Sequence, residues 1–243
     1  MASKGLKLAV KYSYRPFMLG FCGPQHSACR TVLTNYILGA KVKEKDVADI
    51  LKQFVGAFPY YALIAWKNKI KDVFDPKVVE AYWVGNSLLD KVSRQDIGIM
   101  ILAVFVGGGW LKAKRAKKII TSLPPGVVPH HTFHVLFMGS VTDTIKIKGK
   151  AIDYCRIGWG KVKEVKENKL LLETNPFGLK PRPKLGKKEV KTIDWEPNFK
   201  IKVKKGDWVS FHWDFLCDRL TKTQLKNLEK YTKHNLKLYA QKN

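Results

Sequence analysis

Cysteine is scarce in this chain, with 4 residues among 243. Small secreted domains that depend on disulfide bonds carry a much higher density of cysteine. Residues 1–11 alternate charged side chains with single apolar ones, which is unlike the apolar segment of a secretory signal. We therefore expect a cytoplasmic protein whose thiols are reduced.

Long apolar runs are missing as well. The longest, IGIMILAVFVGGGWL, covers only residues 97–111 and contains four glycines. A helix that crosses a bilayer needs about 20 apolar residues in succession. The sequence therefore predicts no membrane span, and it favours a buried core segment at this place.

Acidic side chains are few, with 20 against 45 basic ones and a net charge of +25. Such an excess is typical of proteins with an anionic partner, nucleic acid included. Most of the excess is lysine, which is a flexible point charge and a poorer reader of phosphates and bases than arginine. Nucleic acid is a possible partner on this evidence, but not the favoured one.

The common signatures of nucleotide-dependent and hydrolytic enzymes are absent. There is no G-x-S-x-G sequence, no phosphate-binding loop and no dinucleotide fingerprint. Gly107–Gly109 lacks the Lys-Ser/Thr pair that a phosphate-binding loop requires. The sequence therefore favours a protein that is not an enzyme, and it leaves the question open.

The sequence is rich in periodic apolar patterns, and their period changes once. Up to Leu123 apolar residues recur every three or four positions, which predicts helices over 25–38, 42–54, 59–70, from 76 onward, 93–105 and 110–122. The sequence Leu123-Pro-Pro-Gly126 ends this pattern. Beyond it, alternation predicts strands over 130–138, 154–165, 169–174, 190–195 and 208–213, and Thr221 begins an amphipathic helix to Tyr239.

These patterns predict an α+β protein with two domains. An all-helical domain over 1–125 precedes a small antiparallel β-barrel domain over 126–243, which is OB-like and ends in a helix.

Two separated motifs carry the most specific signal. The first is CRIGWGKV, from Cys155 to Val162, and the second is GDWVSFHWDFLC, from Gly206 to Cys217, followed by Arg219-Leu220. Together they resemble the HypC/HupF family of hydrogenase assembly chaperones, with Cys155 at the family cysteine and His212 at the family histidine. The sequence departs from the family pattern at Trp159, where the family has proline, and at Asp214, where it has glycine. Cys155 is internal, whereas the family cysteine begins the mature chain.

The resemblance implies a role in building nickel–iron hydrogenase. Members of that family hold iron, with its cyanide and CO ligands, through the cysteine and the histidine. They receive it from an iron-scaffold accessory protein and pass it to the hydrogenase large-subunit precursor. Cys155 and His212 would be the iron ligands here. From the residues themselves, we expect Arg156 to favour the Cys155 thiolate and Asp214 to orient the His212 imidazole.

Some of the remaining cysteines and histidines are further candidates for metal ligands. Cys22 precedes a predicted helix N-terminus, where the helix dipole would lower the pKa of its thiol. On a strand over 130–138, His130 and His134 would share one face and His131 would lie on the other. The candidates are Cys22, His130, His134 and Cys217.

Two other functions are compatible with the sequence. One is an RNA- or ribosome-associated protein with an SH3-like or OB-like barrel. The other is a metalloenzyme whose site lies between the two halves, where the HHTFH segment meets Cys155 and His212. The whole chain also resembles an uncharacterised prokaryotic family, which implies no function.

Overall fold

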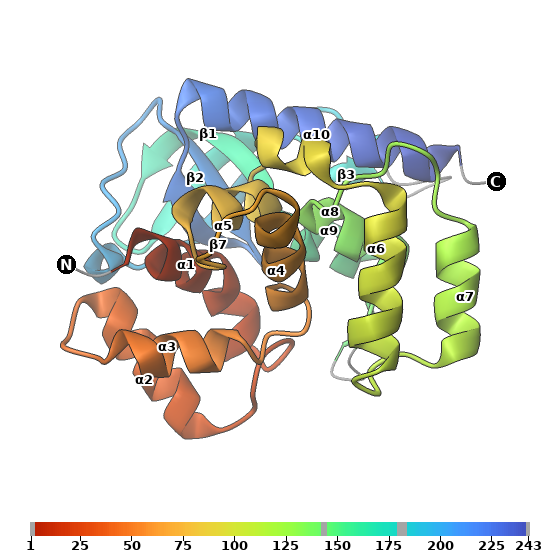
Figure 1. The fold of residues 1–243 in the computed structure, drawn as a ribbon. Helices are drawn as coiled ribbons and strands as arrows, with labels where there is room; N and C mark the ends of the chain where they lie inside the picture. Colours follow the sequence, from red (N-terminus) through yellow and green to blue (C-terminus); the bar gives the residue numbers. More distant parts are fainter. Residues whose placement is uncertain (1–2, 142–144, 179–183, 242–243) are drawn as a thin grey trace.

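The protein is described by a computed structural model, which covers residues 3–141, 145–178 and 184–241 (Figure 1). Helices make up the described part before residue 125. They are α1 (Lys4–Met18), α2 (Ser27–Leu38), α3 (Glu44–Leu51), α4 (Phe58–Lys67), α5 (Pro76–Trp83), η1 (Ser87–Lys91), α6 (Arg94–Met100), which continues as the π-helical η2 (Ile101–Val106), and α7 (Ala113–Thr121).

The ends of these helices follow from local side-chain chemistry. The Asp75 carboxylate accepts a hydrogen bond from the backbone N–H of Lys77, so α5 begins at the following proline. Ser93 and Asp96 form a reciprocal capping box at the start of α6. Gly39 ends α2 with φ of +88°, a conformation that glycine adopts without a steric penalty. The sequence predicted a helix start at Pro76, a helix from Ser93 and a helix end at Gly39, but it did not predict the capping box or α1.

The segment 130–138, predicted as a strand, is helical. It forms α8 (His131–Phe133) and the π-helical η3 (His134–Met138), and every residue in it is buried. A short helix that is buried on all sides shows no alternation between a buried and an exposed face, so the period of its sequence does not distinguish it from a buried strand. The predicted strand 154–165 also begins later than expected, because Cys155 is the last residue of helix α9 (Lys150–Cys155) and β1 begins at Gly158.

Five strands close on themselves in the order β1-β2-β5-β7-β6, with β6 returning to β1. Most neighbours in this ring are antiparallel, but β5 and β7 pair in parallel through Asp194 and Phe215. This pair corrects the expectation of a purely antiparallel barrel. The strands are β1 (Gly158–Val165), β2 (Lys169–Thr174), β5 (Glu189–Asp194), β6 (Trp208–His212) and β7 (Phe215–Arg219), and β3 (Phe177–Gly178) pairs separately with β4 (Lys184–Leu185).

A tight turn joins β6 to β7. His212 pairs with Phe215, so only Trp213 and Asp214 lie between the strands. Both have positive φ, 52° and 53°, as in hairpin turns whose twist matches that of the flanking strands. Neither residue is glycine, so the backbone conformation here is held at a steric cost.

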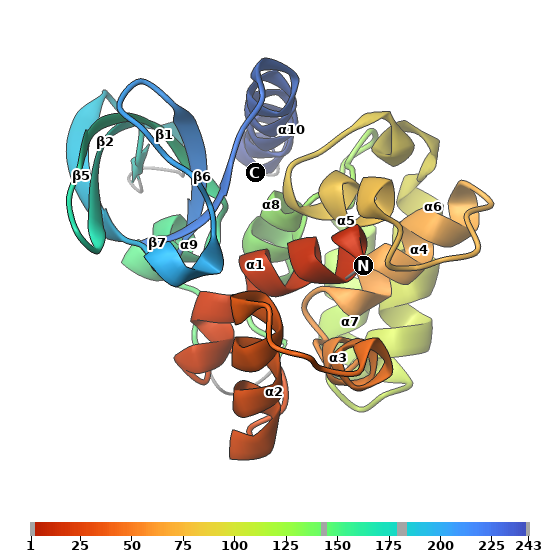
Figure 2. The ribbon, with the colours of Figure 1, turned by 90° about the vertical axis from the view of Figure 1, so that its left-hand side faces the viewer.

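The sequence predicted a helix start at Thr221, and helix α10 (Lys222–Ala240) begins there with a capping box between Thr221 and Gln224. The α+β class and the C-terminal helix are confirmed. Figure 2 shows the ring of strands on one side, most of the N-terminal helices on the other, and α1 and α10 between them. Buried apolar residues from both parts of the chain belong to one continuous core.

Two contacts show how closely the parts pack. The Tyr12 hydroxyl, on α1, lies 2.8 Å from the Ser210 hydroxyl, on β6. Gly85, which follows α5, lies against the Tyr231 ring of α10. None of the helices in the described residues combines the length and the apolar character needed to cross a bilayer.

Candidate metal centre

Three buried side chains from different elements meet next to the ring of strands. They are His131 at the start of α8, Cys155 at the end of α9 and His212 at the end of β6. One ligand atom of each lies within 4.8 Å of the others. Thiolate and imidazole are the ligands that bind zinc, iron and copper ions in proteins. The structure therefore brings together the two residues of the sequence motifs and adds a histidine from the helical segment.

The cluster lies on the wall of a cavity of about 480 Å³. The helical part contributes Cys22, Phe54 and Trp83 to this wall, and Trp213 comes from the β6–β7 turn. Most of the wall is apolar, and its polar residues include Gln25, Gln53 and Ser140 besides the cysteines and histidines. A cavity of this size can hold a small ligand beside the cluster.

The hydrogen bonds of His212 fix its tautomer. Its Nδ1 lies 2.7 Å from the backbone carbonyl oxygen of Tyr12, and a carbonyl only accepts, so Nδ1 carries the proton. Burial lowers the pKa of His212 to about 4, so the imidazole is neutral at pH 7. Its Nε2 therefore presents a lone pair, and this buried atom has no hydrogen-bond partner among the described residues. This is the arrangement of a metal-binding histidine, with one nitrogen anchored and the other available.

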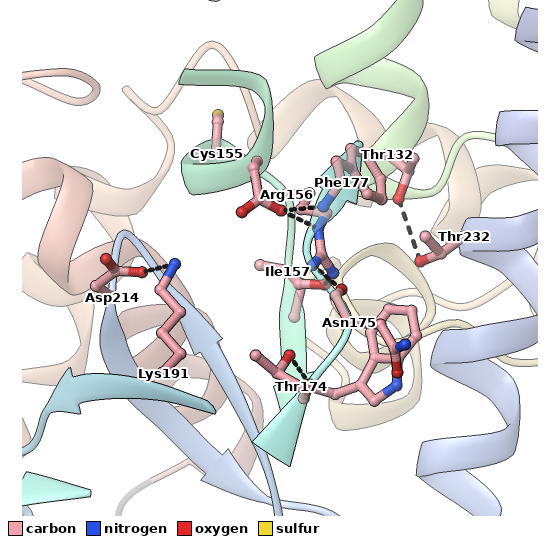
Figure 3. Close-up of polar contacts among 12 residues, drawn as sticks. Thr132, Cys155, Arg156, Ile157, Thr174, Asn175, Phe177, Lys191, Asp214 and Thr232 are labelled. Carbon is pink, nitrogen blue, oxygen red and sulfur yellow. Dashed lines mark hydrogen bonds and ion pairs between the residues drawn. The ribbon is translucent and has the colours of Figure 1, made fainter. Parts of the chain in front are cut away.

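The Cys155 thiol is protonated in this environment. Burial raises its pKa to about 12, and the indole N–H of Trp213 acts weakly in the opposite direction. The expected help from Arg156 is not present, because the guanidinium is directed away from the sulfur (Figure 3). A cation that binds here must displace the thiol proton, so metal binding would release a proton.

Arg156 has a structural role instead. It is fully buried, and its Nε donates to the Asp153 carboxylate at 2.8 Å. Its Nη2 donates to the carbonyl of Asn175 at 2.7 Å, and the guanidinium lies 4.4 Å from the centre of the Phe177 ring. These contacts fasten the end of α9, and with it Cys155, to the chain that follows β2.

Asp214 does not orient His212, contrary to expectation. It lies in the turn after β6 rather than on the strand, and its carboxylate pairs with the Lys191 ammonium at 2.6 Å (Figure 3). The Tyr12 carbonyl has the orienting role instead. The alternation argument failed because the strand ends at His212.

The other candidates differ in their distance from the cluster. Cys22 and His134 line the same cavity but are not part of the cluster. The His134 Nδ1 lies 3.0 Å from the Tyr60 hydroxyl. The thiol of Cys22 has a raised pKa because of burial and the neighbouring Cys155, which reverses the expected dipole effect, since α2 begins only at Ser27.

His130 and Cys217 do not line the cavity. His130 caps α8 by accepting a hydrogen bond from the backbone N–H of Thr132. Cys217 is buried in β7, where its thiol contacts the carbonyl of Phe215 at 3.7 Å.

His131 was missed as a member of the cluster because its segment was taken for a strand. Strand alternation placed it on the face opposite to His130 and His134. In the helical segment, His131 and His134 are three positions apart, and their rings stack with centroids 6.3 Å apart. A signal for this was present: the segment follows Pro129 directly and has no turn residue before Gly139, which also fits a short buried helix.

Comparisons with known proteins add a family but no function. The chain matches no curated protein, and it matches no solved structure. Over residues 1–243 it matches one family model, described as a family of unknown function (DUF6390). By sequence, therefore, the chain belongs to the DUF6390 family.

Proposed function

We propose that this protein carries an iron centre on Cys155 and His212 and delivers it during the assembly of nickel–iron hydrogenase. The observation that carries the proposal is the buried Nε2 of His212, which is unprotonated, lacks a hydrogen-bond partner and lies beside the Cys155 thiol. A buried polar atom without a partner costs about 1–3 kcal/mol unless something binds it. A metal ion would relieve that cost.

The donor set suits iron that carries small ligands. A thiolate and a neutral imidazole both bind iron, and few protein ligands leave positions open for other groups. The adjacent cavity of about 480 Å³ offers room for diatomic ligands such as cyanide or CO. The iron is cargo in this proposal, so open positions also let an acceptor protein take it.

The sequence motifs are the support for choosing this pathway. The resemblance of 155–162 and 206–217 to the HypC/HupF chaperones favours a hydrogenase large-subunit precursor as acceptor and an iron-scaffold protein as donor. The helical part has no counterpart in that resemblance. It supplies much of the cavity wall, through Phe54 and Trp83 among others.

Anaerobic Fe²⁺ binding to the full chain tests the proposal. Cys155→Ser should abolish binding, because a hydroxyl is a much poorer ligand than a thiolate. His212→Ala should weaken it by at least about tenfold. Cys217→Ser is the matched control, since this buried cysteine lies outside the cavity. Wild-type affinity in Cys155→Ser would refute the proposal.

A second function is favoured by the enclosure of the cluster. Three buried donors beside a cavity are also the arrangement of a catalytic metal with an open position, as in zinc enzymes. In that case the metal would be resident and would not be transferred. A chelator challenge separates the two: a carrier should release its iron to a competing chelator within minutes, and a resident metal should stay bound for hours.

A further inference from the structure

The apolar run over residues 97–111 is only partly buried, although its sequence favoured a core segment. One side of α6 and η2 packs in the core, but large apolar side chains on the run remain exposed. They are Ile99 at 60%, Leu102 at 51%, Val104 at 38% and Trp110 at 48% exposed, and we call these four the hairpin face. Contiguous exposed apolar side chains mark a contact with a protein or a membrane.

The hairpin face has little to offer a polar partner. Every exposed residue between Asp96 and Lys112 is apolar or glycine. The Trp110 indole is the only side chain among them that can form a hydrogen bond. An interface between proteins usually contains about one hydrogen bond per 100–200 Å². The apolar part of a bilayer needs none, and tryptophan is enriched where a bilayer meets water.

Cations lie beside the hairpin face. Helix α7 follows it in the sequence and packs against η2, and Figure 1 shows α6 and α7 side by side at one edge of the molecule. Residues 97–122 contain no acidic side chain. The exposed lysines at the start of α7 and along it are Lys112, Lys114, Lys117 and Lys118. None of them belongs to an ion pair among the described residues.

This combination is complementary to one kind of surface. Apolar side chains with tryptophan, next to lysines, are typical of segments that lie in the boundary region of a bilayer. The negative charge of anionic lipids attracts such lysines, and each contributes to binding. A protein surface with acidic groups would pair with the lysines, but it would leave the hairpin face without matching polar contacts.

We infer that the hairpin face docks on a membrane surface that contains anionic lipids. The four apolar side chains enter the boundary region of the bilayer, and the α7 lysines lie near the lipid phosphates. The inference does not depend on the proposed metal binding, because no residue of the hairpin face is a candidate ligand. Trp110 also lines the cavity of the metal centre, so the docked bilayer lies close to that cavity.

Sedimentation of the full chain with lipid vesicles tests this inference. Vesicles of equal parts phosphatidylcholine and phosphatidylglycerol supply the anionic surface, and vesicles of phosphatidylcholine alone are the neutral reference. The wild type should bind the anionic vesicles at least about tenfold more tightly than the neutral ones. Salt should weaken the binding, because it screens exposed charges.

Leu102→Glu tests the apolar contribution. It places a charge at an exposed position of the hairpin face and should weaken binding to the anionic vesicles at least about tenfold. Val190→Glu is the matched control, because Val190 is 63% exposed on β5. It should bind like the wild type. Circular dichroism checks that both variants are folded.

The double variant Lys114→Glu/Lys117→Glu tests the charged contribution. It should weaken binding at least about tenfold. Lys222→Glu/Lys226→Glu changes the net charge equally, but at exposed positions of α10. This control should weaken binding less than about threefold, because salt screens charges that lie far from the lipid surface.

Three results would overturn the inference. The first is wild-type affinity for the anionic vesicles in Leu102→Glu. The second is a wild type that does not sediment with the anionic vesicles, which would leave a protein as the occupant of the hairpin face. The third is light scattering that shows a dimer in the wild type and a monomer in Leu102→Glu, without vesicle binding in either. Unchanged Fe²⁺ binding in a Leu102→Glu protein that has lost vesicle binding would support a surface separate from the metal centre.

Discussion

Asp153→Asn should destabilise the protein by removing the partner of a buried charge. The Arg156 side chain is 1% exposed, and the Asp153 side chain is 17% exposed. The carboxylate accepts from Arg156 Nε at 2.8 Å and from the backbone N–H of Phe177 at 2.8 Å. The substitution leaves the shape and one acceptor oxygen but removes the negative charge.

The expected cost follows from the enclosure of the guanidinium. Removing one member of a buried ion pair costs about 3–5 kcal/mol, because the remaining charge stays buried without compensation. Asp153 retains some contact with water, so we expect a value near the lower limit, about 3 kcal/mol. Replacing both members by groups of similar size is often close to neutral. The double variant Asp153→Asn/Arg156→Met should therefore be more stable than Asp153→Asn alone.

Urea unfolding followed by tryptophan fluorescence measures these differences, with Lys233→Gln as a control from an exposed ion pair. The control should change the free energy of unfolding by less than about 1 kcal/mol. A loss below about 1 kcal/mol in Asp153→Asn, or a double variant less stable than the single one, would refute the structural role assigned to Arg156.

Three other properties can be predicted from the structure. Gly85→Ala should cost about 2–3 kcal/mol, measured by urea unfolding, since φ is +96° and an added Cβ would lie 2.2 Å from the Tyr231 ring; an unchanged stability would contradict the packing of α10. The metal-free protein should lose stability as pH falls from about 6.5 toward 4, because burial lowers the pKa of His134 and His212 to about 4 and the unfolded chain binds more protons in that window. Each shift lowers the stability by up to about 3 kcal/mol between pH 7 and pH 4, and a flat dependence of melting temperature on pH would oppose this. RNA binding, measured by filter retention, should be weak, unspecific and steeply reduced by salt; tight, sequence-selective binding at physiological salt would favour the RNA-associated alternative.

The elements that the sequence predicted well have strong local signals. The capping residues Asp75, Ser93 and Thr221 each mark a helix start that the structure contains. The alternation over 169–174 and 208–213 marks β2 and β6 nearly to the residue. Such signals are local, so they can be recognised without knowledge of the tertiary structure.

The errors come from segments whose secondary structure is determined by tertiary packing. Helix α1 contains Pro16 and a mixture of charged and apolar residues, and its apolar face is stabilised by contact with α5 and the strands. The helical segment 131–138 has no exposed face, so periodicity could not identify it. Both errors affected the site, because α1 carries the Tyr12 carbonyl that anchors His212, and a strand placed His131 on the wrong face.

The sequence identified some residues of the site but not others. Cys155 and His212 lie in two separate motifs and are 57 positions apart in the sequence, and the structure places their ligand atoms within 4.8 Å. The backbone carbonyl of Tyr12 orients His212. Every residue has such a carbonyl, so the sequence pattern could not identify this one. Asp214 was the natural choice by proximity in sequence, but the turn after β6 directs it to Lys191.

Anaerobic isolation of the full chain, followed by metal analysis and infrared spectroscopy on the same sample, tests the central claim most directly. The account predicts about one iron per chain with absorption bands from iron-bound cyanide or CO, and the loss of both in Cys155→Ser. Cys217→Ser should retain both, because Cys217 lies outside the cavity. A wild-type protein that contains no iron and shows no such bands, after isolation from cells that make nickel–iron hydrogenase, would contradict the account.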